Sequence, residues 1–90
     1  MEISYDHTKD QLNIAKHGMS LSKTSELNFD TAFVMEDFRY DYGEKPYNAI
    51  GFIRNRLHVL TFTPRAKGIR AISLRKANIR ESKKYGKKIH

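Results

Sequence analysis

The sequence predicts a single α+β domain, in which an antiparallel sheet combines with two N-terminal helices and one C-terminal helix. Three observations lead to this fold class. Ninety residues can close one hydrophobic core but not two, so residues 1–90 are expected to form one domain. Apolar residues before Ala32 have helical spacing, whereas β-branched and aromatic runs separated by turn residues follow it. The lysine-rich end is again helical in pattern.

The N-terminal segment is expected to form a short strand and a first helix. Residues 3–5 suit a strand, and Asp6 can cap a helix that runs to about His17. Gly18 then occupies the position where helices often end in a left-handed residue. The predicted inward stripe of this helix consists of Leu12, Ala15 and Met19.

A second, shorter helix is expected after the glycine. It begins at Ser20 or Ser22, either of which can act as the N-cap, and it ends near Asn28. Leu21 and Leu27 are expected to face the core.

Short connections predict an antiparallel meander of four further strands, at 32–38, 47–53, 57–63 and 69–75. Residues 41–46 form the first connection, 54–56 a tight hairpin and 64–68 a longer turn. Alternation predicts one apolar face that covers the helices, made of Ile50, Phe52, Leu60, Phe62, Ile72 and Leu74. The opposite face would carry Ala49, Gly51, Val59, Thr61, Ala71, Ser73 and Arg75.

The last element is expected to be a basic helix. Asn78 with Glu81 three residues later resembles a capping box, and lysines enrich the residues that follow. The predicted element order is therefore β-α-α-β-β-β-β-α.

Charge is distributed unevenly along the chain. Residues 1–45 hold five Lys and Arg against nine Asp and Glu, net −4, and residues 46–90 hold twelve against Glu81 alone, net +11. Because self-repulsion in the basic half costs stability, this asymmetry favours a polyanionic partner such as nucleic acid. A solvated basic face is the alternative reading of the same charges.

Composition also excludes several classes. No run approaches eighteen apolar residues, and the N-terminus lacks the basic and apolar regions of a signal peptide, so we expect a cytoplasmic protein that does not bind membranes. With no cysteine, the chain has no disulfide framework, thiolate catalysis or cysteine-ligated metal.

The motifs of the common cofactor-dependent and hydrolytic folds are missing. No GxGxxG, Walker A, HExxH or GxSxG pattern occurs, and the four histidines lack metal-ligand spacing, so no metal or other cofactor is expected. A cationic surface without a metal can bind phosphate and stabilise the phosphorane formed when a 2′-hydroxyl attacks the adjacent phosphodiester. The expected substrate is RNA, because DNA has no 2′-hydroxyl.

The densest group of cations runs along the last predicted strand into the final helix and is the predicted substrate surface. Its members are Arg65, Lys67, Arg70, Arg75, Lys76 and Arg80. We assign catalysis to Arg65, Arg70 and Arg75, and RNA binding to the other three together with Tyr85. Arg70 and Arg75 are five positions apart, which places them on opposite faces of an ideal strand, so at least one is structural unless a bulge intervenes.

Two further side chains are candidates for proton transfer. His17 can act as an acid or base near neutral pH, although a histidine before a terminal glycine is also an ordinary helix-end cation. Glu44 can act as a base, although a solvated ion pair with Lys45 explains it equally well. Tyrosines at 42, 47 and 85 offer rings for stacking on unpaired bases, with core packing as the alternative.

Four groups of residues occur in a fixed order along nearly the whole chain. They are Tyr5-Asp6 with Lys9 and Asn13; Lys16-His17-Gly18; Asp41-Tyr42-Gly43-Glu44 followed by Tyr47, Ala49 and Gly51; and Arg70-x-Ile72-Ser73-x-Arg75-Lys76-Ala77 with Glu81 and Tyr85. In combination, these residues resemble the BrnT toxins of type II toxin–antitoxin systems, which have the RelE-like ribonuclease fold and usually have Trp-Asp in place of Tyr5-Asp6.

The resemblance implies a toxin that cleaves RNA and inhibits translation, with a BrnA-like antitoxin as its partner. It also implies that operator DNA is contacted only through the toxin–antitoxin complex. This sequence has Pro64 where the family commonly has a glutamate before the arginine matched by Arg65. That leaves Glu44 or His17 as the proton acceptor, or no general base. The rival hypotheses are a non-enzymatic RNA- or DNA-binding module and an interaction protein for an acidic partner.

Overall fold

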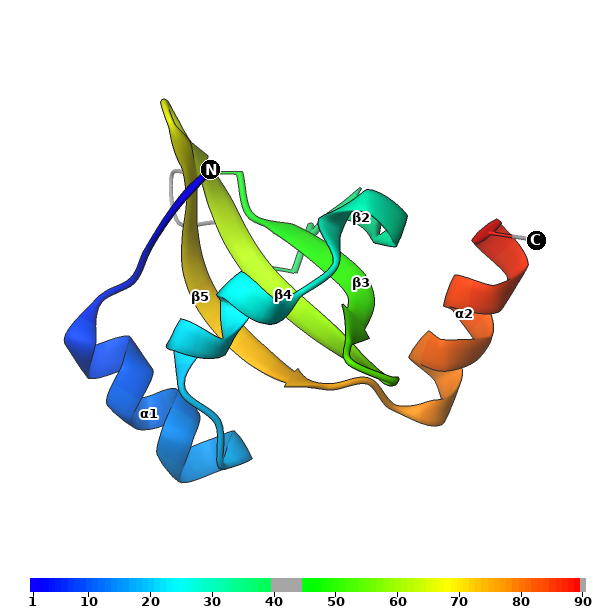
Figure 1. Ribbon diagram of the computed structural model, residues 1–90, viewed down its shortest axis with the longest axis horizontal. Coiled ribbons are helices and arrows are strands. Elements are labelled where there is room, and N and C mark those ends of the chain that lie inside the picture. Colours follow the sequence, from blue (N-terminus) through cyan, green and yellow to red (C-terminus); the bar gives the residue numbers. More distant parts are fainter. Residues whose placement is uncertain (40–44, 90) are drawn as a thin grey trace.

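Five strands form one sheet in the order β1-β5-β4-β3-β2 in the computed structural model, which describes residues 1–39 and 45–89 (Figure 1). The expected antiparallel meander is formed by β2 (Phe33–Glu36), β3 (Tyr47–Ile53), β4 (Arg56–Arg65) and β5 (Gly68–Lys76). The first strand, β1 (Glu2–Ser4), pairs parallel to β5, so the sheet is mixed. This edge needs a glycine at Gly68, where a Cβ would clash with the backbone of Glu2.

The turn between β4 and β5 is shorter than predicted. The ladder continues through Pro64 opposite Ile69 and Arg65 opposite Gly68, so only Ala66 and Lys67 form the turn. Pro64 is tolerated in β4 because it lies beyond Phe62, the last residue of this strand that pairs with β3.

The first helix, α1 (His7–His17), begins and ends as predicted. The Asp6 carboxylate accepts the backbone N–H of Lys9 at 3.1 Å, and Gly18 ends the helix with a φ of 69°. The second helix is a 3-10 helix, η1 (Leu21–Glu26), which is capped by Ser20 and followed by a 3-10 turn, η2 (Phe29–Thr31). Leu21 and Leu27 are buried, as expected.

The inward face of α1 is polar, contrary to the apolar stripe expected for it. Leu12 is 63% exposed, whereas Asp10 and Asn13 are buried. The Asn13 amide donates to the Leu74 carbonyl at 2.9 Å and accepts the Leu74 N–H at 3.0 Å. Asn13 therefore pairs with the edge of β5 beyond the point where β1 ends. Its hydrogen bonds offset the free-energy cost of burying this polar side chain.

Both faces of the sheet are covered, and the cross-strand register differs from the one expected. Ala49 pairs with Leu60 and Leu60 with Leu74, so Ile50 lies on the face opposite Leu60. The cluster beneath α1 and η1 contains Leu21, Leu27, Ala49, Ile53, Leu60, Phe62, Ile69, Ala71 and Leu74. The cluster on the other face contains Ile50, Val59, Ala77 and Tyr85. Alternation within β3 and β4 is as predicted, but the predicted register between strands was wrong, and in β5 Ala71 lies in the same cluster as Leu74.

The C-terminal helix, α2 (Ile79–Ile89), begins with the predicted capping box. Asn78 N–H donates to the Glu81 carboxylate at 2.9 Å, and Glu81 N–H donates to the Asn78 side-chain oxygen at 2.8 Å. The helix packs through Tyr85, whose ring meets Phe52 edge-on with centroids 5.6 Å apart. Figure 1 shows α2 on the far side of the molecule from α1.

Candidate functional site

A β-bulge in β5 shapes the candidate site. Thr61 pairs with Ser73, but the next residue, Phe62, pairs with Ala71, so Ile72 is the extra residue. The alternation of side chains along β5 therefore changes at Ile72.

This bulge places Arg70 and Arg75 on the same face of the sheet. Arg70 lies opposite Thr63 and Arg75 opposite Val59, and these two partners have the same parity on β4. Arg65 has that parity as well, and its guanidinium donates to the Thr63 hydroxyl at 3.0 Å. The sequence alone did not decide whether such a bulge is present. With it, the three predicted catalytic arginines lie on the face on which α2 packs.

An open groove of about 460 Å³ lies between this face and α1. Four of its lining residues are cations, and no carboxylate is among the described residues that line it. The lining comprises Lys9, Leu12, Asn13, Lys16, His17, Arg39, Thr61, Ile72, Ser73 and Arg75. The groove therefore brings together two of the predicted catalytic residues, His17 and Arg75.

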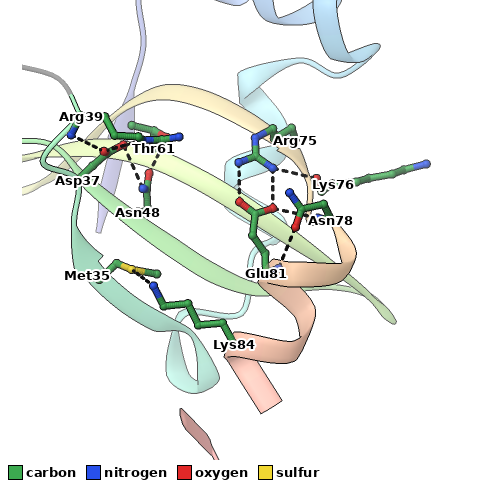
Figure 2. A network of polar contacts seen from close by, with 10 residues as sticks. All are labelled: Met35, Asp37, Arg39, Asn48, Thr61, Arg75, Lys76, Asn78, Glu81 and Lys84. Atoms are coloured by element: carbon green, nitrogen blue, oxygen red, sulfur yellow. Dashed lines mark hydrogen bonds and ion pairs between the residues drawn. The ribbon is translucent and has the colours of Figure 1, made fainter. Parts of the chain in front are cut away.

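Arg75 is held by the first turn of α2. Its two terminal nitrogens lie 2.8 and 2.7 Å from the two carboxylate oxygens of Glu81, as Figure 2 shows. The same carboxylate takes part in the capping box with Asn78, so the helix start fixes its position. Hydrogen bonds from Arg75 are the main cause that lowers the pKa of Glu81, and the charge of Arg39 also contributes.

A second network crosses the sheet to Arg39. The Thr61 hydroxyl donates to Asn48 at 2.8 Å, the Asn48 amide donates to Asp37 at 3.0 Å, and Asp37 receives two bonds from the Arg39 guanidinium at 3.0 and 2.9 Å (Figure 2). The Asp37 side chain is 2% exposed and that of Arg39 is 62% exposed. Hydrogen bonds from Arg39 lower the pKa of Asp37 to about 2.

His17 is the last residue of α1, half-buried at the wall of the groove. Burial lowers its pKa below the ordinary 6.5, and the nearby charges of Lys16 and Arg75 lower it further. Its neutral form therefore predominates at neutral pH, as a proton acceptor requires.

The other predicted site residues are placed differently. Arg65 and Arg70 share the face but are outside the groove lining, and Lys67 is exposed in the β4–β5 turn. Lys76 ends β5 and Arg80 lies in the first turn of α2, both exposed. Glu44, like Tyr42, lies outside the described residues.

Tyr85 was predicted to bind RNA, and this prediction was wrong. Its side chain is buried, its ring meets Phe52, and its hydroxyl donates to the Thr31 carbonyl at 3.0 Å. A ring in this position is part of the core and is not exposed for stacking on an RNA base. Tyr47 is half-buried and stacks on Phe62, with centroids 5.9 Å apart.

Sequence reasoning missed Arg39 and the residues that hold it. Opposite charges two residues apart, at Asp37 and Arg39, were a weak signal of a local ion pair. Asn48 is a stronger one, because it is a polar residue between Tyr47 and Ala49 in an otherwise apolar strand. A polar side chain on a covered face generally has a hydrogen-bonding partner.

Two findings concern the residues that the structure describes. Among them, no three His, Asp or Glu side chains gather in a group that could hold a metal ion. None of the described helices is both long and apolar enough to cross a membrane.

Comparison with known proteins points to one family. The family model of BrnT, the ribonuclease toxin of type II toxin–antitoxin systems, matches residues 5–81. The chain is also similar to the 1.1 Å crystal structure of the Brucella abortus ribonuclease toxin BrnT, with a TM-score of 0.66 and 29% identity over 87% of this chain and 97% of that chain. No curated protein sequence matches significantly. The matched residues include the whole groove lining and the Arg75–Glu81 pair.

Proposed function

Because this chain belongs to the BrnT ribonuclease toxin family of type II toxin–antitoxin systems, we propose that it cleaves RNA without a metal ion, in the groove between α1 and the sheet. Cleavage of RNA inhibits translation, and a BrnA-like antitoxin neutralises the protein. Operator DNA is contacted only through the complex with that antitoxin.

The observation that carries this proposal is the position of Arg75 beside His17 in a groove lined by cations. Both residues line the groove, and the positive charge of Arg75 contributes to the lowered pKa of the His17 imidazole. An arginine held by a carboxylate is an oriented, permanently charged donor for a phosphate. A neutral imidazole can accept a proton.

The proposed reaction uses the 2′-hydroxyl of the substrate as its nucleophile. His17 takes the proton as the 2′ oxygen attacks the neighbouring phosphorus, and the bond from phosphorus to the 5′ oxygen breaks. The leaving oxygen takes a proton from solvent, which yields a 2′,3′-cyclic phosphate and a 5′-hydroxyl. Arg75 stabilises the charge of the phosphorane but transfers no proton, because a guanidinium keeps its protons in proteins.

The remaining cations of the predicted surface bind the substrate on either side of the groove. Arg65 and Arg70, which we assigned to catalysis from the sequence, lie outside the groove lining and instead contact phosphates along the same face of β4 and β5. Lys67 contacts a phosphate at the turn beyond them. Lys76 and Arg80 contact RNA near the start of α2. Each exposed contact contributes modestly, and the affinity for RNA depends on salt.

Growth arrest tests this function. Expression of the chain should stop growth, and co-expression of the neighbouring antitoxin gene should restore it. Arg75→Ala should abolish the arrest, whereas Arg56→Ala, an equal loss of charge at an exposed position outside the groove, should not. Circular dichroism checks that both variants fold. A folded Arg75→Ala variant that still arrests growth fully would overturn the site, and RNA binding without cleavage would favour a non-enzymatic binding module.

A further inference from the structure

Arg39 lies outside the cluster of cations that forms the predicted substrate surface, yet it lines the groove. It follows β2 in the chain, whereas Lys9, Lys16 and His17 come from α1, which packs against β5 near the other end of the strand order. The floor between them is formed by Thr61 of β4 and by Ser73 of β5. Cations therefore reach the groove from both sides.

Arg39 is anchored more firmly than an ordinary exposed arginine. Its Nε and Nη2 lie 3.0 and 2.9 Å from the two carboxylate oxygens of Asp37, and its backbone N–H donates to the same carboxylate at 3.1 Å. Asp37 is in turn fixed by its own N–H, which donates to the Pro46 carbonyl at 3.0 Å. A charged side chain held in one orientation loses less entropy when it binds a ligand.

The network behind Asp37 begins at the groove itself. Thr61 lines the groove and donates to Asn48, which donates to Asp37, which in turn accepts from Arg39. The first and last residues of this chain of hydrogen bonds, Thr61 and Arg39, both line the groove. Burial of the Asp37 carboxylate is costly and is offset here by four donated hydrogen bonds from Arg39 and Asn48. Such an arrangement orients a guanidinium that remains largely in solvent.

Arg39 and the Arg75–Glu81 pair act in the same electrostatic environment. The charge of Arg39 contributes to the low pKa of Glu81, which places it within electrostatic range of the carboxylate that holds Arg75. Arg39 and Arg75 therefore line the same groove, and each is held by its own carboxylate, Asp37 or Glu81.

We propose that Arg39 is a phosphate-binding residue of this groove, positioned by Asp37 to contact an RNA phosphate next to the one that is cleaved. The inference rests on the proposed function and adds to it a second, oriented arginine that fixes the register of the RNA across the sheet. Arg39 binds the substrate and does not act on the reacting atoms.

Binding of a 2′-O-methyl RNA, which cannot be cleaved, tests the assignment. Arg39→Ala should weaken binding roughly fivefold to twentyfold and lower the slope of log affinity against log salt by about 0.7, as expected for one phosphate contact. Arg39→Lys should restore the slope but not the full affinity, because lysine lacks the planar fork. Asp37→Asn should keep the slope and weaken binding severalfold, and Arg56→Ala should change neither quantity.

Single neutral linkages locate the phosphate. Methylphosphonates are placed one at a time along the oligonucleotide, and the ratio of wild-type to Arg39→Ala affinity is measured for each. The ratio should fall toward one at a single linkage that flanks the cleavage position and stay unchanged elsewhere. A ratio that is the same at every linkage, or a folded Arg39→Ala variant with the affinity and slope of the wild type, would overturn the inference.

The two proposals fail in different ways. If the wild-type chain neither binds nor cleaves RNA, the proposed function is wrong and the inference about Arg39 is wrong with it. If the chain cleaves RNA and Arg39→Ala weakens only the complex with an antitoxin, Arg39 belongs to the protein interface and the phosphate assignment alone is wrong.

Discussion

Arg75 and Glu81 are joined by two parallel hydrogen bonds of 2.8 and 2.7 Å, which tie the end of β5 to the first turn of α2. The carboxylate is also the capping-box acceptor for Asn78. The C-terminal helix therefore sets the orientation of the arginine that, in our proposal, stabilises the phosphorane.

Glu81→Gln should separate positioning of Arg75 from binding of RNA. Glutamine can keep the capping box but not the charge-assisted fork, so we expect kcat to fall about tenfold. RNA affinity should stay the same or rise, because the site gains net positive charge. Single-turnover cleavage and binding to uncleavable RNA give the two quantities. Weaker binding with an unchanged maximal rate would show that Glu81 does not act through Arg75.

Asp37 should make stability depend on pH in the acid range. Its pKa falls from 3.8 to about 2 on folding, so its ion pair stabilises the fold above about pH 4, and this stabilisation is lost as the pH falls through 2. Because Arg39 is exposed, we expect about 1 to 2 kcal/mol at pH 7. Urea denaturation of wild type and Asp37→Asn should show a difference that shrinks toward pH 2. A difference independent of pH would refute this assignment.

Tyr85→Phe should affect stability and leave RNA cleavage unchanged. The substitution removes the hydrogen bond to the Thr31 carbonyl and keeps the ring against Phe52. The expected loss is about 1 kcal/mol, which lowers Tm by roughly 4 to 8 °C in a domain of this size. Thermal unfolding and a cleavage assay provide the readouts. An unchanged Tm with reduced RNA affinity would show that Tyr85 does bind RNA.

Local signals in the sequence predicted much of the fold. Asp6 and Gly18 identified the ends of α1, and Asn78 with Glu81 identified the start of α2, because caps depend on residues close in the chain. The relationship between strands was harder to predict. Alternation is equally satisfied by either cross-strand register, so Ile50 was assigned to the wrong face.

Some residues that were chosen from the sequence line the groove. His17 and Arg75 were chosen by residue type, but the bulge at Ile72 leaves no local signal, and it decides which arginines share a face. Asn13 entered only as part of the family resemblance, and no contact was predicted for it, yet its amide completes the edge of β5. Arg39 was missed because its position depends on Asn48 and Thr61, which lie on two other strands.

The antitoxin should bind the basic half of the chain and compete with RNA. Residues 46–90 carry net +11, so an acidic antitoxin segment would associate rapidly at low salt. Such steering is screened over about 8 Å at physiological ionic strength, so the association rate should fall steeply as salt rises. Stopped-flow mixing at several salt concentrations measures it. A rate indifferent to salt, or a complex that binds RNA as tightly as the toxin alone, would refute a shared surface.

The nature of the RNA ends produced by the purified protein in EDTA tests the account most directly. Cleavage should persist in the chelator and leave 2′,3′-cyclic phosphate or 3′-phosphate ends opposite 5′-hydroxyl ends, because the nucleophile is the 2′-hydroxyl of the substrate. A single 2′-deoxy substitution at the cleaved position should block the reaction. Products with 3′-hydroxyl and 5′-phosphate ends, or activity that disappears with the chelator and returns with a divalent metal, would contradict the account.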